Sequence, residues 1–272
     1  MERSNLIIKP SAPFLRWAGS KRQIIPILSE YWKPTFTRYV EPFAGSASLF
    51  FHLLPPKALL ADINRELILT YRQVKTNHTC VIKELKKLKN NKEQYLKLRS
   101  TDPDNLSYSR QAARFIFLNR FCFNGLYRTN RQGHFNVPYG DGRNKKIPTV
   151  QQFKYYSKLL KNVAFLSADF EQTLQKVRRG DFVYMDPPYT VKNRKIFNEY
   201  SSISFDNKKI EKLRDWLIVL NRKNISFLVS YAESDEAKFL SKGFKTRKVA
   251  VKRNIAGFAN NRRIDKEVLI FN

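Results

Sequence analysis

Residues 39–64, YVEPFAGSASLFFHLLPPKALLADIN, give the clearest indication of the fold. Its apolar pattern predicts a short strand at 39–43, then a turn of small residues, a helix at 47–54 and a second strand at 58–62. The second strand ends in an acid, Asp62. A strand, a small-residue turn, a helix and a strand with a terminal acid make up one nucleoside-binding half of a doubly wound sheet. The sequence therefore predicts an α/β fold with a Rossmann-like sheet.

The alternation of strands and helices lapses after this half and resumes later in the chain. Asn64 can cap the helix that follows it. Further predicted elements are helices at 65–75, 83–99 and 109–121, and a hairpin or compact loop at 123–138. The last part is predicted to hold strands at 163–167, 182–185 and 226–230, a helix at 206–222, and an antiparallel pair at 245–253 and 268–271. We predict one α/β domain, residues 1–75 and 150–272, interrupted by a mostly helical insertion at 76–149.

The chain is strongly basic, with 51 Lys and Arg against 23 Asp and Glu and a formal charge of +28. Residues 111–168 hold ten basic residues and one acid, and residues 242–266 hold nine and one. A generally lysine-rich, solvated surface is the alternative, but two acid-poor blocks favour a face or cleft for a polyanion. A hydrophobic content of 42% and an aromatic content of 14% exclude a disordered chain.

Several kinds of site and compartment are not indicated by this sequence. Its two cysteines are too few for a disulfide framework, and its three widely spaced histidines form no metal-binding pattern with them. We therefore expect no metal. The N-terminus lacks the features of a signal peptide and no apolar run reaches membrane length, so we expect a soluble, cytoplasmic protein that binds no membrane.

The tetrapeptide DPPY, residues 186–189, follows directly on an apolar run and carries the first indication of chemistry. The Asp186 carboxylate can accept one hydrogen of an exocyclic amine, and a rigid prolyl carbonyl can accept the other. The Tyr189 ring can cover the face of a base. A proline-rich turn after a buried strand is the alternative interpretation.

Five segments taken in order resemble one family. They are FLRWAGSK (14–21), EPFAGSAS (41–48), LADIN (60–64), LNRFCFNGLYRTNRQGHFNVPYG (118–140) and DPPY (186–189). Over residues 14–270 the chain resembles the Dam-type, or D12-class, DNA adenine-N6 methyltransferases. Five motifs in one order are much more specific than any one of them, and they displace the proline-turn interpretation.

The resemblance implies S-adenosylmethionine as cofactor and DNA as substrate. It implies a catalytic role for Asp186, Pro187, Pro188 and Tyr189. The implied cofactor-binding residues are Trp17, Ala18, Gly19, Lys21, Glu41, Pro42, Phe43, Gly45, Ser46, Asp62, Ile63, Asp169, Phe170 and Asp186. Among them Asp62 matches the acid that binds the ribose hydroxyls, whereas an Asp in the position of Asp169 is often only a helix cap. Ser20 and Ala47 stand where the family commonly has glycine.

The insertion at 76–149 is implied to read the DNA sequence. The implied DNA-binding residues are Arg16, Phe123, Asn124, Leu126, Arg128, Arg131, Asn136 and Pro138. Arg128 matches a residue that reads guanine, and Phe123 can wedge into the base stack. The basic side chains of Arg131, Arg143, Lys145 and Lys146 are expected to meet phosphates. The hairpin most resembles those of enzymes that act on GATC.

The target adenine is expected to leave the duplex, and Phe197 and Tyr200 can wall the flipped base or simply pack. Two other interpretations stay open. One is an amino methyltransferase for cytosine N4, RNA or protein glutamine, and the other is a DNA-binding protein without catalysis. A monomer is expected, in a bacterial nucleoid or encoded by a phage, and a restriction endonuclease partner is left open.

Overall fold

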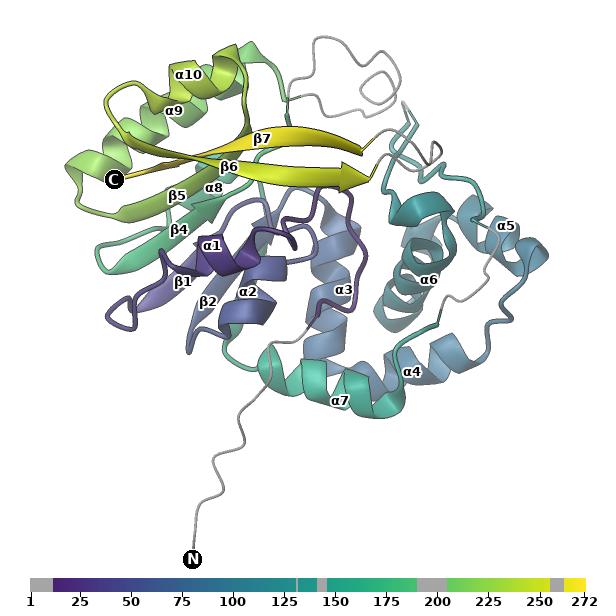
Figure 1. Cartoon of the computed structure of the whole chain (residues 1–272). Coiled ribbons are helices and arrows are strands. Elements are labelled where there is room, and N and C mark those ends of the chain that lie inside the picture. Colours follow the sequence, from purple (N-terminus) through teal and green to yellow (C-terminus); the bar gives the residue numbers. More distant parts are fainter. Residues whose placement is uncertain (1–11, 131, 141–145, 190–204, 255–261) are drawn as a thin grey trace, which may run out of the picture.

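The computed structural model describes residues 12–130, 132–140, 146–189, 205–254 and 262–272, with backbone only for 252–254 and 262–265. Within these ranges it contains one seven-stranded sheet of order β3-β2-β1-β4-β5-β7-β6 (Figure 1). The strands are β1 (Arg38–Glu41), β2 (Ala58–Asp62), β3 (Val163–Ser167), β4 (Asp181–Met185), β5 (Ser226–Ala232), β6 (Lys245–Asn254) and β7 (Arg262–Phe271). Strands β1 to β5 pair in parallel, and β7 pairs antiparallel with both β5 and β6.

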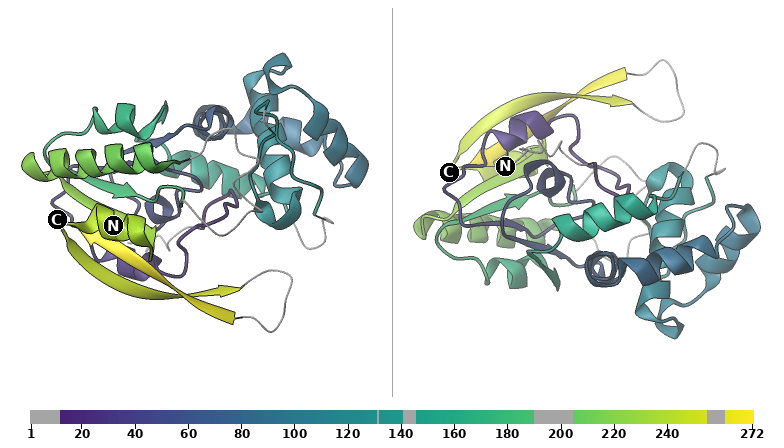
Figure 2. Two further views of the ribbon diagram at one scale, coloured as in Figure 1. Left: turned by 90° about the horizontal axis from the view of Figure 1, so that it is seen from above. Right: turned by 90° about the horizontal axis from the view of Figure 1, so that it is seen from below.

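Helices cover both faces of the sheet (Figure 2). Alternate residues of each strand point to opposite faces, so that Tyr39, Leu60 and Tyr184 belong to one apolar cluster and Val40, Leu59 and Val183 to the other. The first cluster packs under α1 (Ile25–Ser29), α2 (Ser48–Leu53), α3 (Arg65–Thr76) and α7 (Val150–Leu159). The second packs under α8 (Phe170–Leu174), α9 (Asn207–Arg222) and α10 (Asp235–Ser241).

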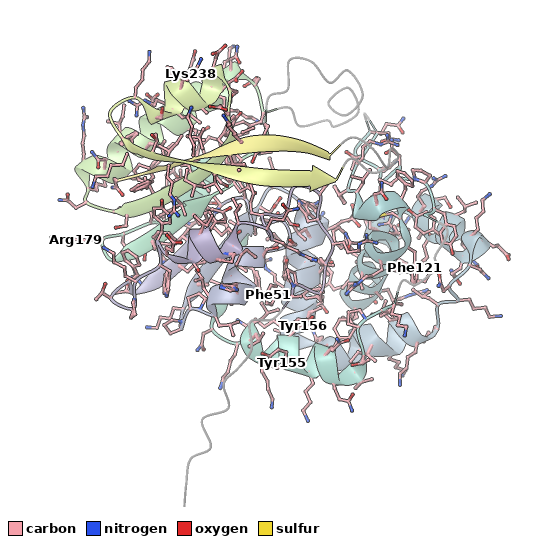
Figure 3. All side chains as sticks on the ribbon, in the orientation of Figure 1. Phe51, Phe121, Tyr155, Tyr156, Arg179 and Lys238 are labelled. Carbon is pink, nitrogen blue, oxygen red and sulfur yellow. The ribbon has the colours of Figure 1, made fainter. Side chains whose placement is uncertain are left out.

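Aromatic rings join the helices of the first cluster. Phe51 of α2 meets Tyr156 of α7 edge to face, with ring centroids 5.8 Å apart, as can be followed in Figure 3. Phe14, from the segment before α1, packs on both Phe51 and Tyr71. The N-terminal segment is therefore fixed to the sheet domain at Phe14, the first residue of the predicted motif at 14–21.

A helical region lies beside the sheet (Figure 1). It consists of α4 (His78–Lys86), α5 (Lys92–Ser100), η1 (Pro103–Asn105), α6 (Tyr108–Phe121) and η2 (Phe123–Gly125). Helix α6 is buried almost all round because it packs against α3, α4 and α5. This burial explains why its apolar residues do not follow one narrow stripe.

The prediction of a single charged helix at 83–99 is wrong. The chain forms α4 and α5 instead, and the side chain of Asn91 between them accepts a hydrogen bond of 2.8 Å from Gln94 N. Such a cap starts a new helix and interrupts the old one. The predicted hairpin is a compact loop, because η2 is followed by only isolated bridges in the described residues, one of which joins Thr129 to Phe135.

The predicted strand at 268–271 is too short, because β7 begins at Arg262 and pairs with β6 over its full length. The predicted strands at 58–62 and 163–167 are confirmed. The cap by Asn64 is also confirmed, since its side chain accepts from Leu67 N at 3.0 Å. Because β1 lies between β2 and β4, the carboxyl ends of these strands open a crevice at the point where the strand order reverses.

Candidate active site and DNA-reading loop

A cleft of about 510 Å³ lies at these strand ends, within the usual range for small-molecule sites. Every residue predicted to bind the cofactor, together with Pro187, Pro188 and Tyr189, lines this one cleft. Four acids and two lysines lie among its lining residues: Glu41, Asp62, Asp169, Asp186, Lys21 and Lys209. A protein with a formal charge of +28 therefore contains a cleft in which acids outnumber bases.

Asp186 stands at the end of β4 and is the centre of a polar cluster. Lys21 Nζ lies 2.7 Å from Asp186 Oδ1 and 2.9 Å from Oδ2. Ser230 of the neighbouring strand β5 donates a hydrogen bond of 3.1 Å to Asp186 Oδ1. Because β4 is fully buried and ends at the crevice, the Asp186 side chain is held there with only 20% of its surface exposed.

Tyr189 closes this cluster. Lys21 Nζ lies 4.8 Å from the centroid of the Tyr189 ring, and the ring packs on Tyr231 at 4.9 Å. The hydroxyl of Tyr189 donates to Glu267 Oε1 at 3.4 Å. Glu267 is also 3.7 Å from Lys21 Nζ, and sequence reasoning missed it, because nothing near it in the chain marks it as part of a site.

Asp62 is oriented by backbone groups at the end of β2. Its Oδ2 accepts from Gly45 N at 3.0 Å, and its Oδ1 accepts from Asn64 N at 2.9 Å. Burial raises the pKa of the Asp62 carboxyl, and these two hydrogen bonds oppose the rise. The loop around Gly45 is also held by α3, because the hydroxyl of Tyr71 in that helix donates to Gly45 O at 2.9 Å.

Glu41, at the end of β1, is 3% exposed. It accepts a hydrogen bond of 2.9 Å from the hydroxyl of Tyr39. Burial raises the pKa of Glu41 well above its ordinary value, the hydrogen bond from Tyr39 opposes this, and the Asp186 charge adds to it. The cleft is therefore lined by one carboxyl group, that of Glu41, whose ionisation is unfavourable in the folded protein.

Trp17 forms one wall of the cleft. A Cβ added at Gly45 would lie 2.7 Å from Trp17 Cδ1, and Gly45 has a φ of +47°, so both space and backbone conformation require glycine. On its other side Trp17 stacks with Tyr127, at a centroid distance of 5.4 Å and an interplanar angle of 17°. Trp17 thus joins the turn at Gly45 to the segment that precedes Arg128.

The remaining cleft residues have mixed surroundings. Asp169 caps α8 by accepting from Glu171 N at 2.9 Å, as the alternative interpretation of this residue allowed, and it also faces the cleft. Phe170 is buried and stacks with Phe43 at 5.5 Å. Ile63 is 46% exposed, which leaves an apolar side chain open to a ligand beside Asp62.

The loop after α6 carries the predicted DNA-binding residues in varied states. Phe123 is 50% exposed, and Asn124 is exposed with a φ of +52°. Arg128 Nε donates to Asn136 Oδ1 at 2.8 Å, which holds the guanidinium in place. Leu126 is half-buried against the core, whereas Pro138 is exposed. The predictions for Arg131, Arg143, Lys145, Phe197 and Tyr200 lie outside the described residues.

Arg16 lies in the N-terminal segment but belongs spatially to this loop. Asn119 of α6 accepts from Arg16 N at 2.9 Å and donates to Arg16 O at 2.7 Å. A Cβ at Gly125 would lie 2.8 Å from Arg16 Cβ, so Gly125 makes room for that side chain. From the sequence, Asn119 was assigned no role.

Comparison with known proteins identifies the family. The family model for the D12 class of N6 adenine-specific DNA methyltransferases matches residues 17–255, which is most of the chain. The chain therefore belongs to this family of enzymes, which transfer a methyl group to adenine in DNA. Membership implies S-adenosylmethionine as the methyl donor.

Individual relatives agree with this assignment. The chain is 36% identical over 269 residues to the type II methyltransferase M1.LlaDCHI of Lactococcus lactis subsp. cremoris, covering 96% of this chain and 95% of that protein. It is 29% identical to a DNA adenine methylase of Vibrio cholerae, covering 97% of each chain. A solved precorrin-6y C5,15-methyltransferase from Geobacter metallireducens is 11% identical and superposes with a TM-score of 0.41, covering 94% of this chain and 93% of that one, a likeness too weak to bear on function.

Two features are absent from the part of the chain that the structure describes. No group of three or more His, Cys, Asp or Glu in this part of the chain is arranged to hold a metal ion. No helix among the same residues is both long and apolar enough to cross a membrane.

Proposed function

We propose that this protein binds S-adenosylmethionine in the cleft at the ends of β1, β2 and β4 and methylates a specific adenine that has been flipped out of duplex DNA. One observation carries the proposal. The carboxylates of Asp186 and Asp62, which would serve a target amine and a ribose diol, line the same cleft. A donor and an acceptor can therefore meet there.

The cleft suits the cofactor in charge and shape. S-adenosylmethionine carries one net positive charge, and acids outnumber bases among the lining residues. Asp62, already oriented by Gly45 N and Asn64 N, retains lone pairs for two ribose hydroxyls. Ile63 and Phe43 offer apolar surface, and Lys21 offers an ammonium to a carboxylate. When bound, the cofactor supplies a methyl group already activated by its sulfonium.

Catalysis by the protein is then mostly positioning. The Asp186 carboxylate accepts a hydrogen bond from the target amine and stabilises the positive charge that builds on its nitrogen. Ser230 and Lys21 hold the carboxylate in one orientation. Tyr189 stacks on the base, with its own ring supported by Tyr231. This chemistry requires no separate general base.

Adenine inside a duplex cannot reach Asp186, so the base leaves the stack at a cost of a few kcal/mol. Phe123 is suited to fill the gap that it leaves, because a large apolar side chain is already exposed there. Binding to DNA is further supported by the acid-poor blocks at 111–168 and 242–266.

We propose that residues 76–149 read the DNA sequence, with Arg128 reading a guanine. The planar fork of the arginine guanidinium suits a bidentate contact with guanine. Arg128 donates to Asn136 Oδ1 from Nε at 2.8 Å and to Asn136 O from Nη2 at 3.4 Å, and these bonds orient its guanidinium. Arg16, fixed by Asn119, approaches the same loop and is proposed to contact a second guanine. GATC is the proposed target.

Modification-sensitive sequencing tests the proposal directly. Unmethylated plasmid is incubated with purified protein and S-adenosylmethionine, and modified bases are mapped. N6-methyladenine confined to one short motif is the expected result, and the motif itself decides whether the site is GATC. Methylated cytosine, or no modified base despite cofactor binding, refutes the proposal. Sedimentation of the protein with and without a duplex tests the proposed monomeric state.

A further inference from the structure

We propose that Glu267 is a positioning residue for methyl transfer. Its carboxylate shares the Lys21 ammonium with Asp186, and it thereby keeps Asp186 able to accept the target amine. The inference rests on the proposed function, because it concerns the same site. It adds a residue from β7, which lies outside every motif that suggested the function.

The sheet brings the side chain of Glu267 into contact with Tyr189 of the DPPY tetrapeptide. Strand β7 runs antiparallel to β5, and Glu267 pairs opposite Ala232 at the carboxyl end of β5. Its side chain is 2% exposed. Glu267 Oε1 lies 3.7 Å from Lys21 Nζ and accepts from the Tyr189 hydroxyl at 3.4 Å. The residue therefore contacts two members of the Asp186 cluster without lining the cleft itself.

The balance of charge explains what such a contact does. One ammonium faces two carboxylates, and the side chains of Lys21 and Glu267 are 8% and 2% exposed. With Asp186 alone, the Lys21 charge would be neutralised by the group that must serve the amine. With Glu267 present, the three groups carry a net negative charge, which favours positive charge on the neighbouring nitrogen.

A purely structural role is the alternative. A buried acid paired with a buried base can simply fasten β7 to the site, and breaking such a pair is destabilising whatever the chemistry. The two roles differ in one respect. If Glu267 acts on catalysis through Lys21, its effect on the rate disappears when Lys21 is removed, whereas its effect on folding need not.

Single-turnover methyl transfer to a duplex containing the mapped target site tests the inference. We expect Glu267→Gln to lower the rate by about 10- to 100-fold, because the Lys21 charge is then neutralised by Asp186 alone, with DNA affinity unchanged. Glu267→Asp, which keeps the charge, should recover part of the rate. In a Lys21→Met background, Glu267→Gln should change the residual rate by less than about twofold.

The matched control is Glu233→Gln, which removes an exposed acid just beyond β5 that pairs with Lys248 at 2.6 Å. Its rate should equal that of the wild type. A wild-type rate in Glu267→Gln, or an undiminished loss in the Lys21→Met background, overturns the inference. If Glu267→Gln does not fold, Glu267→Asp carries the test in the same comparison, and a rate loss that persists undiminished in the Lys21→Met background overturns the inference. A wild-type protein that methylates no DNA refutes the proposed function instead.

Discussion

Replacing Asn119 by alanine should destabilise the protein and loosen both proposed sites. Asn119 is 2% exposed, and its amide makes two hydrogen bonds to the backbone of Arg16, at 2.9 and 2.7 Å. Each backbone group left without a partner costs about 1–3 kcal/mol. Because Arg16 is only half-buried, water can reach it in part, so we expect the lower end of the sum, about 2–3 kcal/mol.

Urea unfolding of wild type and Asn119→Ala measures this loss as a change in the free energy of unfolding. Asn90→Ala is the control, because Asn90 is exposed and makes one bond of 3.3 Å to Tyr139, and it should cost less than about 0.5 kcal/mol. The affinity for S-adenosylmethionine should fall as well, since Trp17 follows Arg16 directly. A loss below 0.5 kcal/mol for Asn119→Ala would refute the argument that these two bonds fix the N-terminal segment.

Three further predictions concern single residues of the site. Asp186→Ala should abolish methyl transfer and leave the fold intact, and a near-normal single-turnover rate would contradict its role. Arg128→Ala should reduce discrimination at one guanine by about 1–3 kcal/mol, measured by competition between duplexes, whereas equal losses on every sequence would make it a phosphate contact. Burial raises the pKa of the Glu41 carboxyl in the folded protein, so folding favours the protonated form of this group. The contribution of Glu41 to stability is therefore present below the unfolded pKa of about 4.3 and is lost as pH rises through the folded pKa. The free energy of unfolding of Glu41→Gln, relative to that of the wild type, should therefore rise when the pH is raised from 5 to 8 in the absence of cofactor. The same difference between the two proteins at both pH values would exclude this titration.

Local patterns in the sequence were sufficient for much of the sheet domain. The strands at 58–62 and 163–167 and the cap by Asn64 follow from runs of apolar residues and from one side chain near a helix start. Helix α7 was missed, although Thr149 and Gln152 form a capping box that could have revealed it. The break between α4 and α5 was missed as well, because the charged residues on either side of Asn91 continue without change.

The strand and helix order of the nucleoside-binding half follows from local patterns of residues, and the family follows from five motifs in one order. Which side chains meet depends instead on the tertiary structure. Asn119 reaches Arg16 across 103 residues, and Lys21 reaches Asp186 across 165. Glu267 lies near Lys21 because β7 enters the sheet antiparallel beside β5. Secondary structure depends on neighbours along the chain, whereas an ammonium shared between two carboxylates depends on sheet topology, which no local pattern of residues specifies.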